Sequence, residues 1–329
     1  MKIGFIGLGR MGAPMVRNIA RSGAELMVWD VSPNAVQALV ADGAHAGESA
    51  AHVTSKVDIL FTSLPGPVES EAVVFGPAGI LESVRPGQVY FDLSTNSLAL
   101  IRRIHNAFAE RGAAVLDAPV SGGPAGADTG KLAIWVGGDQ AVFERHLPLL
   151  RTFSDSPRRI GEIGAGTVAK LVHNLSCYAM CSVLAETFSL GVKAGVDPMD
   201  LYEALYTGVM GRSSILELLH PKFLSGQWNP ASFALKLGRK DVALALDLGK
   251  QVGVPMRVCA QTLEDFTEAL AKDMGDLDSG AFMDLQLQRA GVRIAVEPER
   301  IALARLRIAA GGTAPLTTPG FPQTAGRTS

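Results

Sequence analysis

Two groups of residues in this 329-residue chain have types and spacings that suit chemistry. The first is a glycine-rich loop, Gly7–Gly12, with an acidic residue, Asp30, 21 residues after Gly9. The second is a lysine and an amide, Lys170 and Asn174, four residues apart in an otherwise apolar stretch. The first group suits the binding of phosphates and a ribose, and the second suits proton transfer beside a bound ligand.

The glycine loop matches the pattern G-x-G-x-x-G, and its residues are Gly7, Leu8, Gly9, Arg10, Met11 and Gly12. A predicted strand, Lys2–Ile6, precedes the loop and a predicted helix, Ala13–Arg21, follows it, which is the context that a dinucleotide-binding loop needs. The three glycines would permit a tight turn, a close approach to a pyrophosphate and close packing of helix on strand. The alternative is an ordinary strand–turn–helix connection that binds nothing.

Asp30 follows a second predicted strand, Leu26–Trp29. A carboxylate there can accept hydrogen bonds from both hydroxyls of an adenosine ribose, and it would repel a 2′-phosphate. The next residues, Val31-Ser32-Pro33-Asn34, contain no arginine that could hold such a phosphate. This favours NAD over NADP as the cofactor without excluding NADP, unless the aspartate is incidental.

Two further pairs, Leu64-Pro65 and Ser94-Thr95, each follow a predicted strand. In a doubly wound sheet the carboxyl ends of the strands face the ligand crevice. We therefore predict that Leu64, Pro65 and Thr95 line the nicotinamide side of the cofactor. Plain turn chemistry explains the same residues equally well.

Lys170 and Asn174 share one face of a helix predicted from Gly166 to about Ala194. A lysine that faces a cleft and is partly desolvated has a lowered pKa, so it can shuttle a proton near neutral pH. Composition alone favours the other interpretation, a solvated lysine. His173 is interpreted as a packed or surface histidine, and Cys177 and Cys181 as core residues rather than zinc ligands, so no metal is predicted.

Two other stretches contain candidate binding groups. In Asp117–Pro124 a predicted strand ends in Ser121, Gly122 and Gly123, whose backbone N–H groups can hold a carboxylate. In Gly238–Asp241 a predicted helix begins, and Lys240 there can reach a cofactor or substrate. The alternative for Lys240 is a solvated residue at a capped helix start.

The elements that must position these residues change character along the chain. In the first half, short apolar runs alternate with helical patterns, which indicates parallel βαβ units in an α/β fold. Beyond about Ile160 the patterns are almost all helical. We predict a domain of residues 1–162 with a doubly wound sheet, an all-α domain of residues 163–310, and a mobile tail, residues 311–329, that is rich in Gly, Pro and Thr.

Composition excludes several classes of protein. The net charge is −2 and no basic block stands out, so we expect neither nucleic acid nor an anionic membrane surface as a partner. The chain has only three cysteines, and an odd number cannot all form pairs, which argues against a disulfide framework. This favours a reducing compartment. No targeting segment and no membrane-spanning run are visible in the sequence, so we predict a cytoplasmic protein.

Four blocks, in order, resemble the β-hydroxyacid dehydrogenases, the family of 3-hydroxyisobutyrate dehydrogenase and tartronate semialdehyde reductase. The blocks are Gly7–Gly12 with Met15 and Asn18, Asp117–Gly123, Gly164–Asn174, and Phe233–Asp241. The likeness covers about residues 1–290. It implies a Rossmann domain, a long interdomain helix, an all-α domain and a homodimer or homotetramer.

The resemblance also implies roles for single residues. Lys170 would be the general acid/base, and Asn174 would support the substrate. Ser121, Gly122 and Gly123 would hold the substrate carboxylate, and Thr95 and Lys240 would lie by the nicotinamide. Trp135 departs from the family, which often has a smaller residue there, and Arg212, in Gly208–Ser214, either pairs with a second anionic group of the substrate or lies on the surface.

The implied reaction is the NAD(P)-dependent interconversion of a small β-hydroxy acid and its semialdehyde or keto acid, with a small anionic hydroxy acid as the substrate. Two alternatives remain open. One is a non-catalytic NAD-binding or sensor protein on the same fold. The other is a related imine or sugar-acid reductase, although imine reductases usually lack a lysine at the position of Lys170.

Overall fold

The computed structural model describes residues 2–193, 195–208, 222–251 and 257–310. The chain divides into two compact units, the first ending at Leu171 and the second beginning at Val172, and each is described by itself. The division falls within a long helix, α8 (Ala165–Lys193). The expected domain boundary between residues 162 and 163 stays a prediction.

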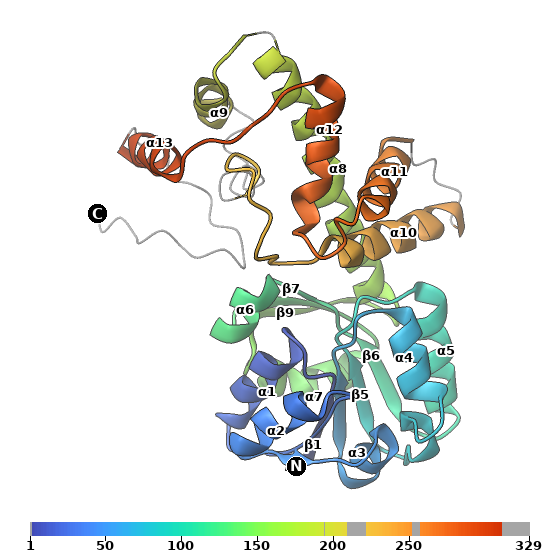
Figure 1. Cartoon of the computed structure of the whole chain (residues 1–329). Helices are drawn as coiled ribbons and strands as arrows, with labels where there is room; N and C mark the ends of the chain where they lie inside the picture. Colours follow the sequence, from blue (N-terminus) through green and yellow to red (C-terminus); the bar gives the residue numbers. More distant parts are fainter. Residues whose placement is uncertain (1, 194, 209–221, 252–256, 311–329) are drawn as a thin grey trace. The chain divides into compact units, whose positions relative to one another are not determined.

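The first unit alternates strands and helices, as the apolar runs predict (Figure 1). Its strands are β1 (Lys2–Ile6), β2 (Glu25–Trp29), β3 (His45–Ala46), β4 (Ile59–Thr62), β5 (Val89–Asp92), β6 (Ala114–Asp117), β7 (Val120–Ser121), β8 (Leu132–Gly137) and β9 (Ser154–Gly161). Its helices are α1 (Gly12–Ala20), α2 (Pro33–Ala41), α3 (Ala50–Lys56), α4 (Pro67–Phe75), the 3₁₀ helix η1 (Ile80–Glu82), α5 (Leu98–Ala109), α6 (Gly123–Thr129) and α7 (Gln140–Leu150).

Within the described residues, nine strands form one sheet in the order β3-β2-β1-β4-β5-β6-β8-β7, and β9 pairs with β8. The strands from β3 to β6 are all parallel, with crossovers on both sides of β1, so the predicted doubly wound sheet is confirmed. β8 runs antiparallel to β6 and β7, a departure from the purely parallel units that the alternation indicates. The carboxyl ends of β1, β4, β5 and β6 therefore lie at one edge, where such sheets bind ligands.

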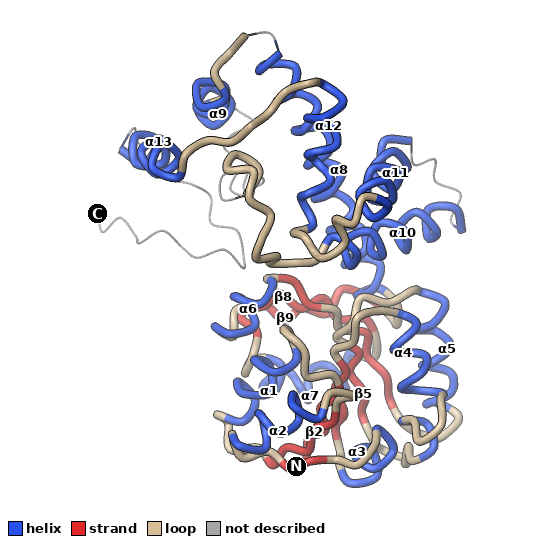
Figure 2. The backbone as a smooth tube through the Cα atoms, viewed as in Figure 1, coloured by secondary structure: helices blue, strands red, loops and turns tan. Residues whose placement is uncertain are grey.

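Two apolar layers cover the two faces of the sheet. One cluster joins Phe5, Phe61 and Phe91 to residues of α1, α2 and α7, and the three rings stack in sequence, with centroids 5.9 and 5.1 Å apart. The other cluster joins Tyr90 and Ile6 to residues of α3, α4 and α5. Figure 2 shows these two sets of helices flanking the strands. Burial on both faces explains why the strands read as continuous apolar runs.

The sequence contains no strand signal for β9, which the structure nevertheless contains. Its residues, Ser154–Gly161, are mostly polar and alternate between partly buried and exposed positions. Among the strands that the structure describes it pairs only with β8, so it is an edge strand of the sheet. An edge strand needs little apolar surface, and its pattern is correspondingly weak.

The second unit is helical over its described residues. After α8 come α9 (Pro198–Thr207), α10 (Leu235–Gln251), α11 (Arg257–Ala271), the 3₁₀ helix η4 (Ser279–Phe282), α12 (Met283–Ala290) and α13 (Pro298–Ala310). Phe266 packs on Phe282 with ring centroids 4.4 Å apart, and Tyr178 of α8 meets Phe266 edge-on at 5.2 Å. The predicted all-α second half with its long helix is confirmed; the predicted helical segment Ile215–Leu218 lies outside the described residues.

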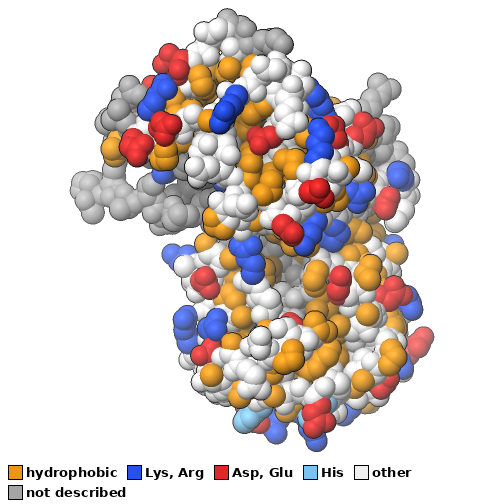
Figure 3. Space-filling view, in the orientation of Figure 1, with side chains coloured by type: hydrophobic (Ala, Val, Ile, Leu, Met, Phe, Trp, Pro, Cys, Tyr) orange, Lys and Arg blue, Asp and Glu red, His pale blue; other side chains and the backbone are white. Residues whose placement is uncertain are grey.

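Charged side chains of both signs lie on the surface of the described chain. On the face shown in Figure 3, Lys and Arg side chains are interspersed with Asp and Glu. Across the described part of the chain, no helix combines the length and the apolar character that crossing a membrane requires.

Candidate functional site

The glycine loop lies between the end of β1 and the start of α1, and its three glycines meet different surroundings. Gly7 has φ +91°, and a Cβ there would lie 2.3 Å from the carbonyl oxygen of Ser63. A Cβ on Gly12 would lie 1.9 Å from the carbonyl oxygen of Gly7. A Cβ on Gly9 would meet no atom within 4 Å. Gly7 and Gly12 are thus required by packing, whereas the space at Gly9 is open to a ligand.

The helix starts of the first unit are of two kinds: α3, α5 and α7 are capped by a side chain, whereas α1, like α2, α4 and α6, is not. The side chains of Ser49, Ser97 and Asp139 accept a backbone N–H at the starts of α3, α5 and α7. At α1 no side chain caps the helix, and its first turn contains no acidic residue. The first N–H groups of a helix need an acceptor, and an anionic phosphate satisfies them best. The residues of this loop therefore fit a dinucleotide pyrophosphate.

Asp30 lies directly after β2 and is partly buried. Its Oδ2 accepts the N–H of Leu8 at 2.6 Å, and its Oδ1 accepts the N–H of Ser32 at 2.8 Å. The carboxylate thus joins the glycine loop to the turn after β2. A carboxylate has about four acceptor positions, so capacity remains for the hydroxyls of a ribose.

The loops after β4 and β5 are held together by a buried polar network. The Leu64 N–H donates to Ser94 Oγ at 3.0 Å. Beneath them Asp92, 0% exposed, accepts the Ser94 N–H at 3.0 Å and the Asn96 side-chain amide at 2.7 Å. Burial raises the pKa of Asp92. The network fixes the loops that contain Leu64, Pro65 and Thr95, the residues predicted to line the nicotinamide side.

Asp117, the last residue of β6, joins the sheet to the start of α8. Its Oδ1 accepts the N–H of Gly164 and its Oδ2 accepts the N–H of Thr167, both at 2.6 Å. The residue is 0% exposed, and burial raises the pKa of its carboxyl to about 6. Lys170 follows Thr167 by three residues on α8 and is half-buried, so it is not a fully solvated lysine.

The turn Ser121–Gly123 joins β7 to α6: Ser121 is the last residue of β7, Gly122 is the connection and Gly123 is the first residue of α6. Ser121 pairs with Ala133 of β8, and the two glycines have φ values of +132° and +62°. No side chain caps the start of α6, and no acidic residue lies in its first turn. Successive backbone N–H groups in such conformations form a concavity that suits an anion.

In the second unit a buried carboxylate connects two of the predicted site residues. Asn174 of α8 is 8% exposed, and its side-chain amide donates to Asp241 Oδ2. Lys240 Nζ lies 2.9 Å from Asp241 Oδ1, and Asp241 is 1% exposed. Asn174 and Lys240, 66 positions apart in the sequence, are thus brought together by one side chain.

The neighbouring candidates lie as follows. His173 is exposed, and its Nε2 lies 4.0 Å from Cys177 Sγ. Cys177 is partly buried, Cys181 is buried and both are free thiols. Within the described ranges no group of three His, Cys, Asp or Glu side chains is arranged to hold a metal ion. Arg212 and the tail from residue 311 lie outside the described residues.

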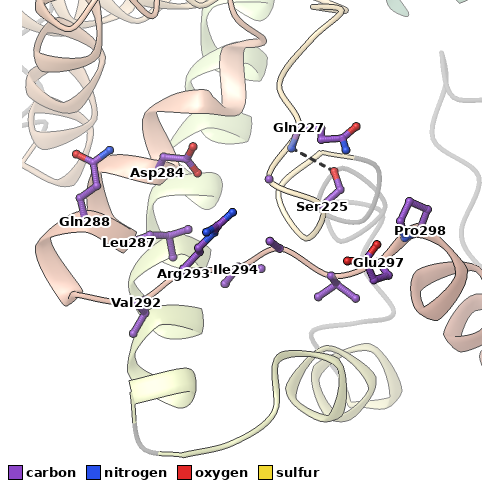
Figure 4. A pocket seen from close by; sticks show the side chains of 13 residues that line it. Ser225, Gln227, Asp284, Leu287, Gln288, Val292, Arg293, Ile294, Glu297 and Pro298 are labelled. Carbon is purple, nitrogen blue, oxygen red and sulfur yellow. Dashed lines mark hydrogen bonds between the residues drawn. The ribbon is translucent and has the colours of Figure 1, made fainter.

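A cavity of about 460 Å³ lies elsewhere in the second unit, between α12 and the segment that precedes α13 (Figure 4). Its lining includes Asp284, Gln288 and Arg293, and it contains none of the predicted site residues. Volume alone therefore does not identify the chemistry of this chain.

Three aspartates organise the predicted site without having been assigned a role from the sequence: Asp92, Asp117 and Asp241. Asp92 and Asp117 each end an apolar strand. An acidic residue at that position lies at the ligand edge of the sheet, so the sequence pattern could have indicated a role in the site. Asp241 directly follows Lys240, and an adjacent cation and anion in one helix gives no signal that one of them is buried.

Comparison with known proteins agrees with this geometry. Residues 2–166 match the family model described as the NAD-binding domain of 6-phosphogluconate dehydrogenase, and residues 164–285 match that described as the NAD-binding region of NADP-dependent 3-hydroxyisobutyrate dehydrogenase.

Similar curated proteins and solved structures cover most of the chain. It is 37% identical to 2-(hydroxymethyl)glutarate dehydrogenase of Eubacterium barkeri, over 89% of this chain and 97% of that protein. It is 36% identical to 2-hydroxy-3-oxopropionate reductase of Escherichia coli, over 86% and 96%. The structure of Mycobacterium tuberculosis 3-hydroxyisobutyrate dehydrogenase with L-serine is similar with a TM-score of 0.78 and 29% identity, over 86% and 98%.

These likenesses span nearly the whole described chain. They agree with three features of the structure: a first domain that fits a dinucleotide, a long helix with Lys170 and Asn174, and a helical second half. The chain belongs to the β-hydroxyacid dehydrogenase family of NAD(P)-dependent oxidoreductases.

Proposed function

We propose that this enzyme interconverts a small β-hydroxy acid and its semialdehyde or keto acid, with Lys170 as the general acid/base. The observation that supports this most directly is the state of Lys170, which is half-buried one turn after a helix start that a buried carboxylate holds. A lysine in this setting has a defined position from which to exchange a proton with a bound hydroxyl.

The other predicted site residues bind the substrate and the cofactor. The turn Ser121–Gly123 offers backbone N–H groups and a hydroxyl to the substrate carboxylate. Asn174, oriented by its bond to Asp241, supports the substrate hydroxyl, and Lys240 contacts the nicotinamide side of the cofactor. In oxidation Lys170 takes the hydroxyl proton, and in reduction it returns that proton to the carbonyl oxygen. The bound nicotinamide cofactor supplies the hydride acceptor or donor, as the family's cofactor chemistry requires.

The cofactor that we propose is NAD. Asp30 places a carboxylate at the end of β2, and no arginine follows in residues 31–34 to hold a 2′-phosphate. NADP remains the alternative, because one matching family model is described as NADP-dependent. We further propose a homodimer or homotetramer in the cytoplasm, in line with the family resemblance and the three free cysteines.

The substrate class follows from the relatives. They are named for 2-(hydroxymethyl)glutarate and 2-hydroxy-3-oxopropionate, and the mycobacterial structure contains L-serine. All are small carboxylates with a hydroxyl or a carbonyl β to an acid group. We expect this chain to accept a member of that class rather than an imine or a sugar-acid phosphate.

A substrate panel tests the proposal. The purified chain is assayed with 2-(hydroxymethyl)glutarate, 3-hydroxyisobutyrate, glycerate and L-serine, each with NAD and with NADP. A sugar-acid phosphate is assayed with the same oxidised cofactors, and an imine is assayed with NADH and with NADPH. Turnover of at least one β-hydroxy acid, with NAD preferred, supports the proposal. Cofactor binding without any turnover would instead indicate a sensor, and turnover of the imine alone would indicate a reductase of the related class.

A further inference from the structure

We propose that Asp117 is the positioning residue for Lys170, acting through the first turn of α8. The inference rests on the proposed function of Lys170. Asp117 itself has no place in the chemical step: it fixes where the helix begins and how the helix is rotated about its axis.

Two hydrogen bonds from one carboxylate define this start. Gly164 N–H donates to Asp117 Oδ1 and Thr167 N–H donates to Asp117 Oδ2, both at 2.6 Å. Gly164 directly precedes α8 and has a φ of +93°, and Thr167 is the third residue of the helix, so the two bonds hold the helix start at two separate points. A single hydrogen bond would allow the first turn of the helix to rotate about that bond. Two hydrogen bonds to one planar carboxylate prevent this rotation.

The carboxylate and the helix start pack closely against the sheet at two glycines. Gly137, the register partner of Asp117 on β8, would place a Cβ 2.4 Å from Asp117 Oδ1. Gly166, inside the first turn, would place a Cβ 2.2 Å from the carbonyl oxygen of Trp135 and 2.6 Å from that of Asp117. The helix thus lies directly on the backbones of β6 and β8, because two glycines remove the side chains that would separate them.

The position of Lys170 depends on where this helix begins. The helix continues without interruption from Ala165, and Lys170 lies one turn beyond Thr167. Helical backbone is stiff over a single turn, so a shift at Gly164–Thr167 becomes a shift of the Lys170 Cα. A displacement of about 1 Å at a reacting group can lower a rate by about a hundredfold.

The test uses Asp117→Asn, which keeps the size of the side chain but leaves only one oxygen to accept an N–H. The matched control is Asp139→Ala, because Asp139 caps α7 by accepting the Val142 N–H at 2.8 Å on the exposed surface, and alanine removes that acceptor. Both variants lose a hydrogen-bond acceptor at a helix start, and only one of these helices bears Lys170. The amide that replaces the Asp117 carboxylate carries no charge to desolvate, so we expect the variant to fold.

We expect Asp117→Asn to lower kcat by about ten- to a hundredfold while the KM for the cofactor stays unchanged. Hydrogen exchange followed by mass spectrometry should show faster deuterium uptake over residues 162–171 in this variant. Asp139→Ala should keep the wild-type kcat and show faster uptake only at the start of α7. Equal kcat in the two variants, or unchanged uptake over residues 162–171 in Asp117→Asn, would overturn the inference.

A second variant approaches the same contact from the other side. Gly137→Ala introduces a methyl group 2.4 Å from Asp117 Oδ1, 2.7 Å from the Glu162 carbonyl oxygen and 2.8 Å from the Ala165 nitrogen. Because these atoms form the same helix start, we expect this variant to reproduce the lower kcat and the faster uptake over residues 162–171. It also covers the case in which Asp117→Asn gives no folded protein. A folded Gly137→Ala variant with wild-type kcat and uptake contradicts the inference.

The proposed function can fail separately. If Lys170→Ala retains the wild-type kcat, Lys170 is not the general acid/base, and the proposed function is wrong. Hydrogen exchange still decides whether Asp117 fixes the start of α8, since that measurement needs neither substrate nor turnover. If Lys170→Ala is inactive and Asp117→Asn is fully active, the positioning inference alone is wrong.

Discussion

Asp92 and Asp117 are register partners at the carboxyl ends of β5 and β6, and both are 0% exposed. Each accepts backbone N–H groups from the segment that follows a strand at this edge: Asp92 from Ser94, and Asp117 from Gly164 and Thr167. Two neighbouring strands of one sheet thus end in buried carboxylates that order different parts of the predicted site. Changes at these and related residues should have measurable effects on turnover, cofactor choice and stability.

The first prediction concerns Lys170. We expect Lys170→Ala to lower kcat by about a hundred- to ten-thousandfold, the usual contribution of a general acid/base. Cofactor affinity, measured by fluorescence titration, should stay unchanged. Lys56→Ala, at an exposed position of α3, is the matched control and should keep full activity.

The second concerns the glycines of the cofactor loop. Gly9→Ala adds a methyl group in open space, so the protein should fold with its normal Tm and bind the cofactor more weakly. Gly12→Ala adds a methyl group 1.9 Å from the Gly7 carbonyl oxygen, so its Tm should fall. Thermal unfolding and cofactor titration of both variants separate the two effects. A normal Tm for Gly12→Ala would contradict the packing argument.

The third concerns the choice of cofactor. We expect Asp30→Ala to reduce the preference for NAD over NADP by about ten- to a hundredfold, because a hydrogen bond to a charged group contributes about 1.5–3 kcal/mol. The ratio of kcat/KM for the two cofactors measures this. Asp42→Ala, which removes an exposed partner of Arg17, should leave the ratio unchanged. A wild-type enzyme that prefers NADP would refute the assignment before any variant is made.

The fourth concerns Asp241. Asp241→Ala leaves the buried Asn174 amide without its acceptor, which should lower the free energy of unfolding by about 1–3 kcal/mol. Asn174 and Lys240 should also lose their fixed positions, so we expect the KM for the substrate to rise. The control is Asp276→Ala on the exposed surface, where Asp276 is 89% exposed and pairs with Lys236 at 2.7 Å. Exposed pairs contribute little, so neither stability nor KM should change there.

The fifth concerns pH and Asp117, whose pKa is raised by burial from 3.8 to about 6. The folded protein then holds a proton that the unfolded chain releases, so this group stabilises the fold below about pH 3.8. That contribution is lost as the pH rises to about 6. It amounts to about 3 kcal/mol, since one pKa unit corresponds to about 1.4 kcal/mol.

Denaturant titration of the wild type and of Asp117→Asn from about pH 4 to about pH 7 measures this contribution. The difference in free energy of unfolding between the two proteins should change across this range in favour of the variant as the pH rises. A difference that does not depend on pH means that the Asp117 carboxyl does not titrate there.

The sequence predicts most of the first unit because its strands are buried on both faces. The predicted strand Lys2–Ile6 agrees with β1 to the residue. β9 could not be predicted, because this edge strand has no continuous apolar run. The antiparallel placement of β7 depends on contacts with β8 that no local pattern encodes.

Some residues of the predicted site can be recognised from the sequence, and others cannot. The glycine loop is visible in the sequence because conformation and close packing demand glycine at Gly7 and Gly12. Composition alone leaves Lys170 ambiguous, because its partial burial arises from tertiary packing. The contact between Asn174 and Asp241 joins residues 67 positions apart, and a single sequence gives no measure of that proximity.

Gly166 packs directly on the backbones of β6 and β8, and this contact limits where the chain can gain or lose residues. Each residue of an α-helix adds a rotation of about 100°, so one residue inserted between Gly166 and Lys170 would turn the lysine away by that angle. Surface loops tolerate insertions and deletions, but the spacing from Asp117's partner Thr167 to Lys170 does not. We therefore expect active relatives with longer or shorter loops to keep this interval unchanged.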